Sequence, residues 1–183
     1  MRKKKFNFDI KNFKMPKACL EEISAEIGII TEGLVVGNVA DYDGAMYSTY
    51  EKKELMPEAI ALFGKGKVVK NIQEDLGQID GPGKTRLEFF LTAPSLKKYK
   101  CRLMFLEYGM GGYPVTIVME YDIARELREA DYILDEYILR CKDMEDFQYF
   151  LNSVIATDYV RGIMQSIITE SLLKKETQNK KKK

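Results

Sequence analysis

RLEFFLTAPSLKKYKCRLMFLEYGMGGYPVTIVME, residues 86–120, contains three apolar segments joined by short links. In the first and third segments apolar residues alternate with other side chains, as in strands with one buried face. The middle segment, 101–106, is apolar on both sides apart from Arg102, which is typical of a central strand. The glycine-rich stretch GMGG at 109–112 separates the last two segments. This part of the chain therefore predicts an antiparallel platform on which the other elements pack.

Helical patterns flank this platform. Before it, a helix is expected over Pro16–Ile27 with Gly28 at its C-terminus, followed by a strand over Ile29–Val39 that is weakened or bulged at Gly33 and Gly37. Shorter helices are expected over Pro57–Phe63 and Lys67–Leu76.

After the platform, Asp122 is expected to cap a helix over Ile123–Ala130, and Asp143 a second one. Thr157 or Asp158 is expected to cap the last helix. Residues 131–141 fit a helix or a strand, and we favour a short strand. The predicted buried positions are Phe147, Phe150, Leu151 and Val154 in the second helix, and Val160, Ile163, Met164, Ile167 and Leu172 in the last.

These patterns predict a single α+β domain over residues 6–173. Its sheet, mainly antiparallel with four to five strands and a core at 86–120, is packed by N- and C-terminal helices. The basic ends, 1–5 and 174–183, are expected to be disordered. No apolar run reaches the length of about 18 residues that a membrane span needs, and the N-terminus lacks the apolar segment of a signal peptide. We therefore expect a cytoplasmic protein with no membrane partner.

The charges are distributed unevenly along the chain. The overall net charge is +1, but residues 1–5 carry +4 and residues 174–183 carry +5, so that residues 6–173 carry −8. Because nucleic-acid recognition usually needs a basic surface on the fold itself, only weak phosphate contacts through the lysine-rich ends are expected. A nucleic-acid-associated accessory protein is therefore an alternative hypothesis.

Histidine is absent from the sequence, which removes the usual general base and the usual zinc ligand. The three cysteines, Cys19, Cys101 and Cys141, are far apart and are expected to be reduced, buried thiols. Residues 81–85 (GPGKT) resemble the end of a phosphate-binding loop. The first glycine of that motif is missing, and a strand rather than a helix follows, so no cofactor is predicted.

Two sets of carboxylates are candidates for metal binding or acid–base catalysis. Asp41 and Asp43 could share a divalent cation, which would suit a metal-dependent phosphoesterase or nuclease, but a bend at Asp43-Gly44 explains them more simply. The strand glutamates could do acid–base work if they converged; we favour a solvated face with cross-strand ion pairs. The residues concerned are Glu88, Glu107 and Glu120, with Arg86, Lys100 and Arg102 as partners.

Tyrosines supply the remaining candidate site. They cluster in an acidic loop and on both sides of the GMGG turn: Tyr42, Tyr47, Tyr50, Tyr108 and Tyr113. Exposed tyrosines often mark interfaces, although they also cap the edges of cores, and the sequence leaves both readings open. We interpret the chain as a non-catalytic interaction module for a protein partner or a small ligand, of unknown oligomeric state.

Overall fold

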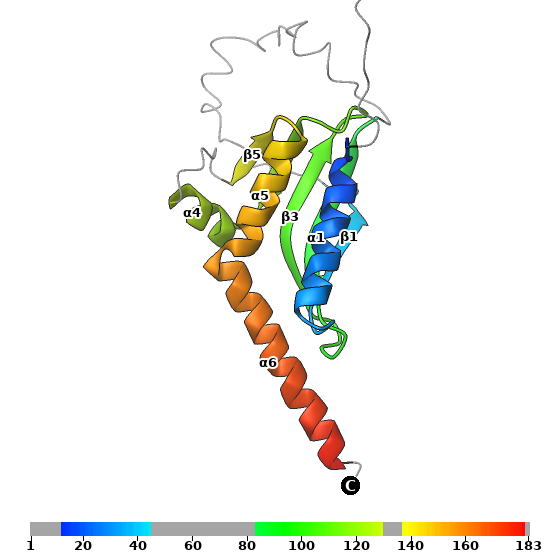
Figure 1. Ribbon diagram of the computed structural model, residues 1–183, viewed down its shortest axis with the longest axis vertical. Helices are drawn as coiled ribbons and strands as arrows, with labels where there is room; N and C mark the ends of the chain where they lie inside the picture. The colour runs from blue at the N-terminus through cyan, green and yellow to red at the C-terminus, as the bar shows by residue number, and fades with distance from the viewer. Residues whose placement is uncertain (1–11, 45–82, 130–136, 182–183) are drawn as a thin grey trace, which may run out of the picture.

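A computed structural model describes residues 12–44, 83–129 and 137–181 (Figure 1). In chain order its elements are α1 (Pro16–Ile30), β1 (Val36–Asp41), β2 (Thr85–Thr92), β3 (Lys100–Tyr108), β4 (Val115–Met119), α4 (Tyr121–Glu129), β5 (Ile138–Cys141), α5 (Met144–Ala156) and α6 (Asp158–Lys181). The predicted helices at 57–63 and 67–76, Tyr47, Tyr50 and residues 1–5 lie outside the described residues. None of the described helices combines the length and apolar character needed to cross a membrane.

The five strands form one sheet in which spatial order follows chain order, β1-β2-β3-β4-β5, and every neighbouring pair is antiparallel. The predicted α+β fold with an antiparallel sheet is therefore confirmed. The strand favoured within 131–141 is also confirmed for residues 138–141, which pair with β4 as β5. Residues 131–136 are outside the described ranges.

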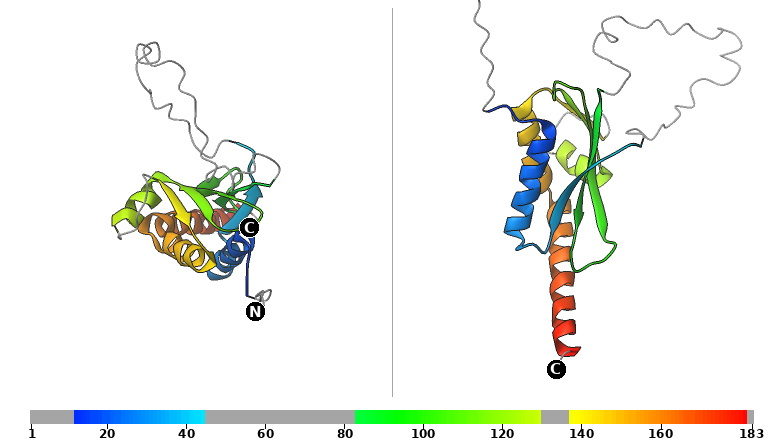
Figure 2. Two further views of the ribbon diagram at one scale, coloured as in Figure 1. Left: turned by 90° about the horizontal axis from the view of Figure 1, so that it is seen from above. Right: turned by 90° about the vertical axis from the view of Figure 1, so that its right-hand side faces the viewer.

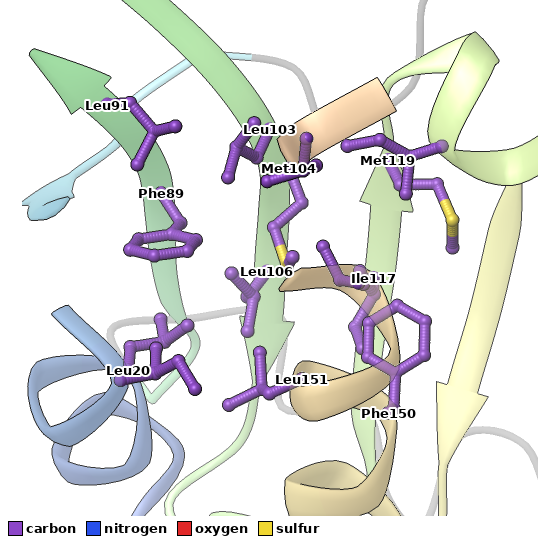
Figure 3. Close-up of a cluster of buried hydrophobic side chains, with 14 of the residues drawn as sticks. Leu20, Phe89, Leu91, Leu103, Met104, Leu106, Ile117, Met119, Phe150 and Leu151 are labelled. Carbon is purple, nitrogen blue, oxygen red and sulfur yellow. The ribbon is translucent and has the colours of Figure 1, made fainter. Parts of the chain in front are cut away.

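Side-chain alternation gives the sheet one fully buried face. In β2, Leu87, Phe89 and Leu91 are completely buried, as the alternating pattern predicts. In β3 the register shifts, because Phe89 pairs with Met104 while the next residue pairs with Arg102. The extra residue, Leu103, is a bulge that places two consecutive apolar side chains in the core (Figure 3).

Helices α1 and α5 cover this face of the sheet (Figure 2). Helix α5 begins where predicted, since the Asp143 carboxylate accepts a hydrogen bond from the Asp146 N–H at 2.9 Å. The predicted stripe on α5 is confirmed, and α1 contributes a similar stripe. The buried side chains are Leu20, Ile23 and Ile27 in α1, and Phe147, Phe150, Leu151 and Val154 in α5.

Helix α1 ends later than predicted. Instead of stopping at Gly28 and leading into a strand from Ile29, the helix continues to Ile30, and β1 begins only at Val36. Thr31 organises the turn, because its hydroxyl donates to the Ile27 carbonyl at 2.7 Å and accepts from the Val35 N–H at 3.2 Å. The next two residues then adopt positive φ, 52° at Glu32 and 72° at Gly33.

The cap of α4 also differs from the prediction. Glu120, not Asp122, accepts hydrogen bonds from the first amides of the helix, those of Asp122 at 2.7 Å and Ile123 at 3.3 Å. Glu120 directly precedes the first residue of α4, so its carboxylate can reach these N–H groups.

Helix α6 was predicted to bury Leu172, and this is wrong: Leu172 is 47% exposed, whereas Ser171 is completely buried. The Ser95 hydroxyl donates to the Ser171 hydroxyl at 2.6 Å, so a polar contact from the β2–β3 loop occupies this position. Among the predicted caps, Thr157 accepts from the Val160 N–H at 3.3 Å. The helix continues through Lys181 and so includes most of the segment expected to be a disordered tail.

Gly37 sets the distance between α1 and β1. A Cβ atom at Gly37 would lie 2.9 Å from the Ser24 Cα, which is backbone and cannot move aside alone. We expect Gly37→Ala to lower the free energy of unfolding by about 1–3 kcal/mol, as overpacking does. Urea denaturation followed by circular dichroism measures this.

Gly28→Ala is the matched control for this substitution. Gly28 lies within α1, and no atom is within 4 Å of its Cβ position. Because alanine favours helix, Gly28→Ala should raise the stability by about 0.5–1 kcal/mol. Equal effects of the two variants would show that the approach of α1 to β1 is not limited by Gly37.

Candidate functional site

The sheet face opposite α1 and α5 carries a row of polar side chains that crosses all five strands. The Tyr42 N–H donates to the Arg86 carbonyl at 3.0 Å, which places Tyr42 directly beyond the end of β1. Arg86 pairs with Glu107, Glu107 with Thr116, and Thr116 with Arg140. Among the described residues, no helix covers this face (Figure 2).

Glu107 is the centre of this row. Arg86 Nε lies 2.7 Å and Lys84 Nζ 3.2 Å from its two carboxylate oxygens. Burial alone would raise the pKa of the Glu107 carboxyl, but the hydrogen bonds and charges of Arg86 and Lys84 outweigh it and hold the pKa below its usual value. The predicted ion pairing of Arg86 is confirmed.

Glu88 forms a second charged cluster on the same face. Glu88 is 8% exposed, and its carboxylate contacts Lys100 and, at 2.9 Å, Arg102 Nε. The two cations also lie over aromatic rings, Lys100 at 4.0 Å from the Phe90 centroid and Arg102 at 4.6 Å from that of Phe105. Burial would raise the pKa of Glu88, but its two partners lower it overall. The predicted pairing of Lys100 and Arg102 is thus confirmed as well.

The strand glutamates do not form an acid–base pair. Such chemistry needs two carboxyls whose pKa values are pushed apart, and here the pKa values of Glu88 and Glu107 are both lowered. Glu120 is engaged as the cap of α4.

A pocket of about 370 Å³ opens at the Lys84 and Arg140 end of the row, beside the β3–β4 turn. We call it the hairpin pocket. Its polar wall is made by Lys84, Glu107, Thr116 and Arg140. The rest of the lining comes from Gly83 and from the turn and its flanks: Tyr108, Gly109, Met110, Gly111, Tyr113 and Pro114. Glu107 is shared between Arg86 and Lys84, whereas the exposed side chain of Arg140 forms no hydrogen bond or ion pair with another described residue. The pocket is therefore positively charged.

Two of the predicted tyrosines, Tyr108 and Tyr113, line this pocket, but their hydroxyl groups are used within the fold. Tyr108 is 5% exposed, and burial raises the pKa of its hydroxyl. The Tyr113 hydroxyl donates to the Lys14 carbonyl at 3.0 Å. Both tyrosines therefore present ring atoms rather than hydroxyls to a ligand.

Tyr113 also fixes the start of α1 to the hairpin. Its ring packs edge-on between Phe13, at 5.8 Å, and Phe147, at 6.3 Å, and its hydroxyl lies 3.7 Å from the Cys19 sulfur. A Cβ at Gly112 would approach the Met15 sulfur to 2.9 Å, so the turn and the N-terminal segment are in tight contact. This side of the pocket is consequently rigid.

Tyr42 lies at the other end of the row, where its ring packs at 4.3 Å on Phe105. It does not join Tyr108 and Tyr113 in the pocket. Asp41 and Asp43 are both exposed. Within the described ranges, no three acidic or thiol side chains gather in a way that could hold a metal ion.

The three cysteines are free, as predicted. Cys19 and Cys141 are buried and Cys101 is partly buried. Burial raises the pKa of all three thiols, that of Cys141 to about 12, so none is activated as a nucleophile.

Sequence reasoning missed the two cations that give the pocket its charge. The sequence patterns identify Lys84 only as part of the GPGKT loop, and Arg140 only as part of a segment that fits either a helix or a strand. Once 138–141 is taken as a strand, alternation places Arg140 on the face opposite Leu139. That it neighbours Thr116 requires the β4–β5 register.

The stability of the protein should depend on pH through Glu88. Because its folded-state pKa is lowered, its contribution is present above the usual value of 4.5 and is lost as the pH falls through the lower folded-state pKa. We expect Glu88→Gln to reduce the free energy of unfolding by about 1 kcal/mol at neutral pH, and the difference from wild type to shrink in acid. Urea titrations across this range measure it.

Glu22→Gln is the control for the pH experiment, since Glu22 pairs with Lys14 on an exposed part of α1. A much smaller loss is expected there because solvent screens the pair. If Glu88→Gln lowered the free energy of unfolding by the same amount from neutral to acid pH, Glu88 would not be the source of the pH dependence.

The chain was also compared with known proteins. No family model, no curated protein and no solved structure matches it. The function of the protein is therefore inferred from the geometry of the hairpin pocket.

Proposed function

We propose that this protein is a non-catalytic binding module and that the hairpin pocket receives an anionic group of a small ligand. The observation that supports the proposal is the imbalance of charge at the pocket: among the described residues, Lys84 and Arg140 line it together with one carboxylate, that of Glu107, which already pairs with Lys84 and with Arg86 beside the pocket. A carboxylate or phosphate oxygen beside Arg140 would restore the balance.

The pocket also has the composition of a small-ligand site. Its volume of about 370 Å³ lies within the usual range for such sites, about 300–1,000 Å³. Tyr108, Tyr113 and Pro114 offer apolar surface, while the charged groups stand on one side. This arrangement suits a ligand with an apolar body and one anionic end.

The lining favours binding over catalysis. Glu107, the one carboxylate among the described lining residues, has a lowered pKa and is held by two cations, so it is a poor general base. The tyrosine pKa values are raised, which leaves both phenols protonated at neutral pH.

Inorganic phosphate is the simplest probe of the site. In a titration followed by amide NMR, the signals of Gly109 and Gly111 should shift with a saturating curve. Arg140→Gln should weaken binding by about tenfold, the expected effect of losing one charge-assisted hydrogen bond. Lys84→Gln should have a smaller effect, because Lys84 already pairs with Glu107.

Arg125→Gln is the matched control. Arg125 is an exposed arginine on α4 that pairs with Asp122 and is not part of the pocket lining. Its removal should leave phosphate binding unchanged. Shifts that do not saturate, or that persist equally in Arg140→Gln, would reject the pocket as an anion site.

A further inference from the structure

A second hollow lies at the opposite end of β3 from the hairpin pocket, between the β2–β3 loop and α6. It has a volume of about 410 Å³, and we call it the α6 groove. The loop contributes Leu96, Lys97, Lys98 and Tyr99, and the helix contributes Ser166, Ile167 and Glu170. Its floor combines aliphatic and aromatic side chains, and its loop edge carries two exposed lysines.

Local contacts hold the loop wall in place. The Leu96 N–H donates to the Ala93 carbonyl at 3.1 Å and the Tyr99 N–H to the Leu96 carbonyl at 3.0 Å, which makes two consecutive turns. Lys98 adopts a φ of 72°, an unusual value for a residue with a side chain. The hydrogen bond between Ser95 and Ser171 then ties this loop to α6. The groove is therefore a formed feature rather than a gap between unconnected segments.

The face of α6 that lines the groove continues beyond it. Ser166, Glu170 and Leu173 follow one another at spacings of four and three residues, so they lie on one side of the helix. Leu173 is 52% exposed and the adjacent Leu172 is 47% exposed. Figure 1 shows this end of α6 extending past the sheet and the other helices. Leu173 thus continues the groove side of α6 beyond the groove, whereas Leu172, two residues after Glu170, lies on the opposite side of the helix.

Positive charge borders the groove and Leu173. Lys97 and Lys98 lie on the loop side, and Lys174 and Lys175 follow the two leucines, all four of them exposed. Glu170 and Glu176 oppose them only in part. Residues 6–173 carry a net charge of −8, so these lysines stand out from an acidic average, as the cations of the hairpin pocket do.

We propose that the α6 groove and Leu173 beyond it bind an acidic segment of a protein partner that inserts one aliphatic or aromatic side chain. The hollow accepts the side chain, Leu173 extends the apolar contact, and the lysines pair with the acidic flanks. A nucleic acid would gain little from Leu173 or from the apolar floor of the groove. A membrane surface would not fill a concave groove. A protein segment can use both the apolar contact and the concave groove.

Selection from a library of short random peptides displayed on phage, with the full chain as target, tests the proposal. Enriched peptides should combine a large apolar residue with aspartate or glutamate on both sides. One enriched peptide, made with a fluorescent label, should lose about tenfold in affinity on Lys97→Glu and on Leu173→Ser, and should bind more weakly as salt rises.

Ile29→Ser is the control, since Ile29 is an aliphatic residue of α1 that is 77% exposed and does not line the groove. The Ile29→Ser variant should bind the peptide with the same affinity as the wild type. Failure to enrich any peptide, enrichment of basic peptides, or equal losses in all three variants would overturn the proposal. The proposal would also be overturned if no peptide bound, while anionic lipid vesicles or a single-stranded oligonucleotide bound in a way that depends on Lys97 and Leu173.

Discussion

The pairing of β2 with β3 is the constraint on which the rest of the structure depends. Because side chains alternate along each strand, this single register decides that Leu87, Phe89 and Leu91 face the helices. The same register places Glu88 and Glu107 on the other side, beside their cations. A slip of one residue would turn the charged side chains of one strand toward the core and its apolar side chains toward solvent.

The sheet also separates two regions of different chemistry. At the turn between β3 and β4, the hairpin pocket combines a rigid tyrosine wall with unbalanced cations. At the other end of β3, the α6 groove is mainly apolar and has lysines at its edge. The two proposed sites thus lie at opposite ends of β3, so a ligand bound at one would not contact a partner bound at the other.

The platform at 86–120 could be predicted because its information is local: alternation marks the strands, and opposite charges on neighbouring strands mark the ion pairs. Apart from the end of α1 and the cap of α4, which are local, the failures concern contacts between distant parts of the chain. Ser171 is buried because Ser95 reaches it, and Tyr113 is fixed because Lys14 accepts its hydrogen bond. Likewise, the hairpin pocket exists only because folding brings Lys84 and Arg140 together. No periodic pattern encodes such pairs.

The contact between α1 and the hairpin has a consequence for protein synthesis. Helix α1 leaves the ribosome well before residues 100–119, yet Leu20, Ile27 and the segment held by Tyr113 need those strands as a packing surface. Until β3 and β4 emerge, the nascent chain displays an amphipathic helix with an unfilled apolar side. Translational pausing before β4 would prolong that exposure and favour chaperone recruitment or aggregation.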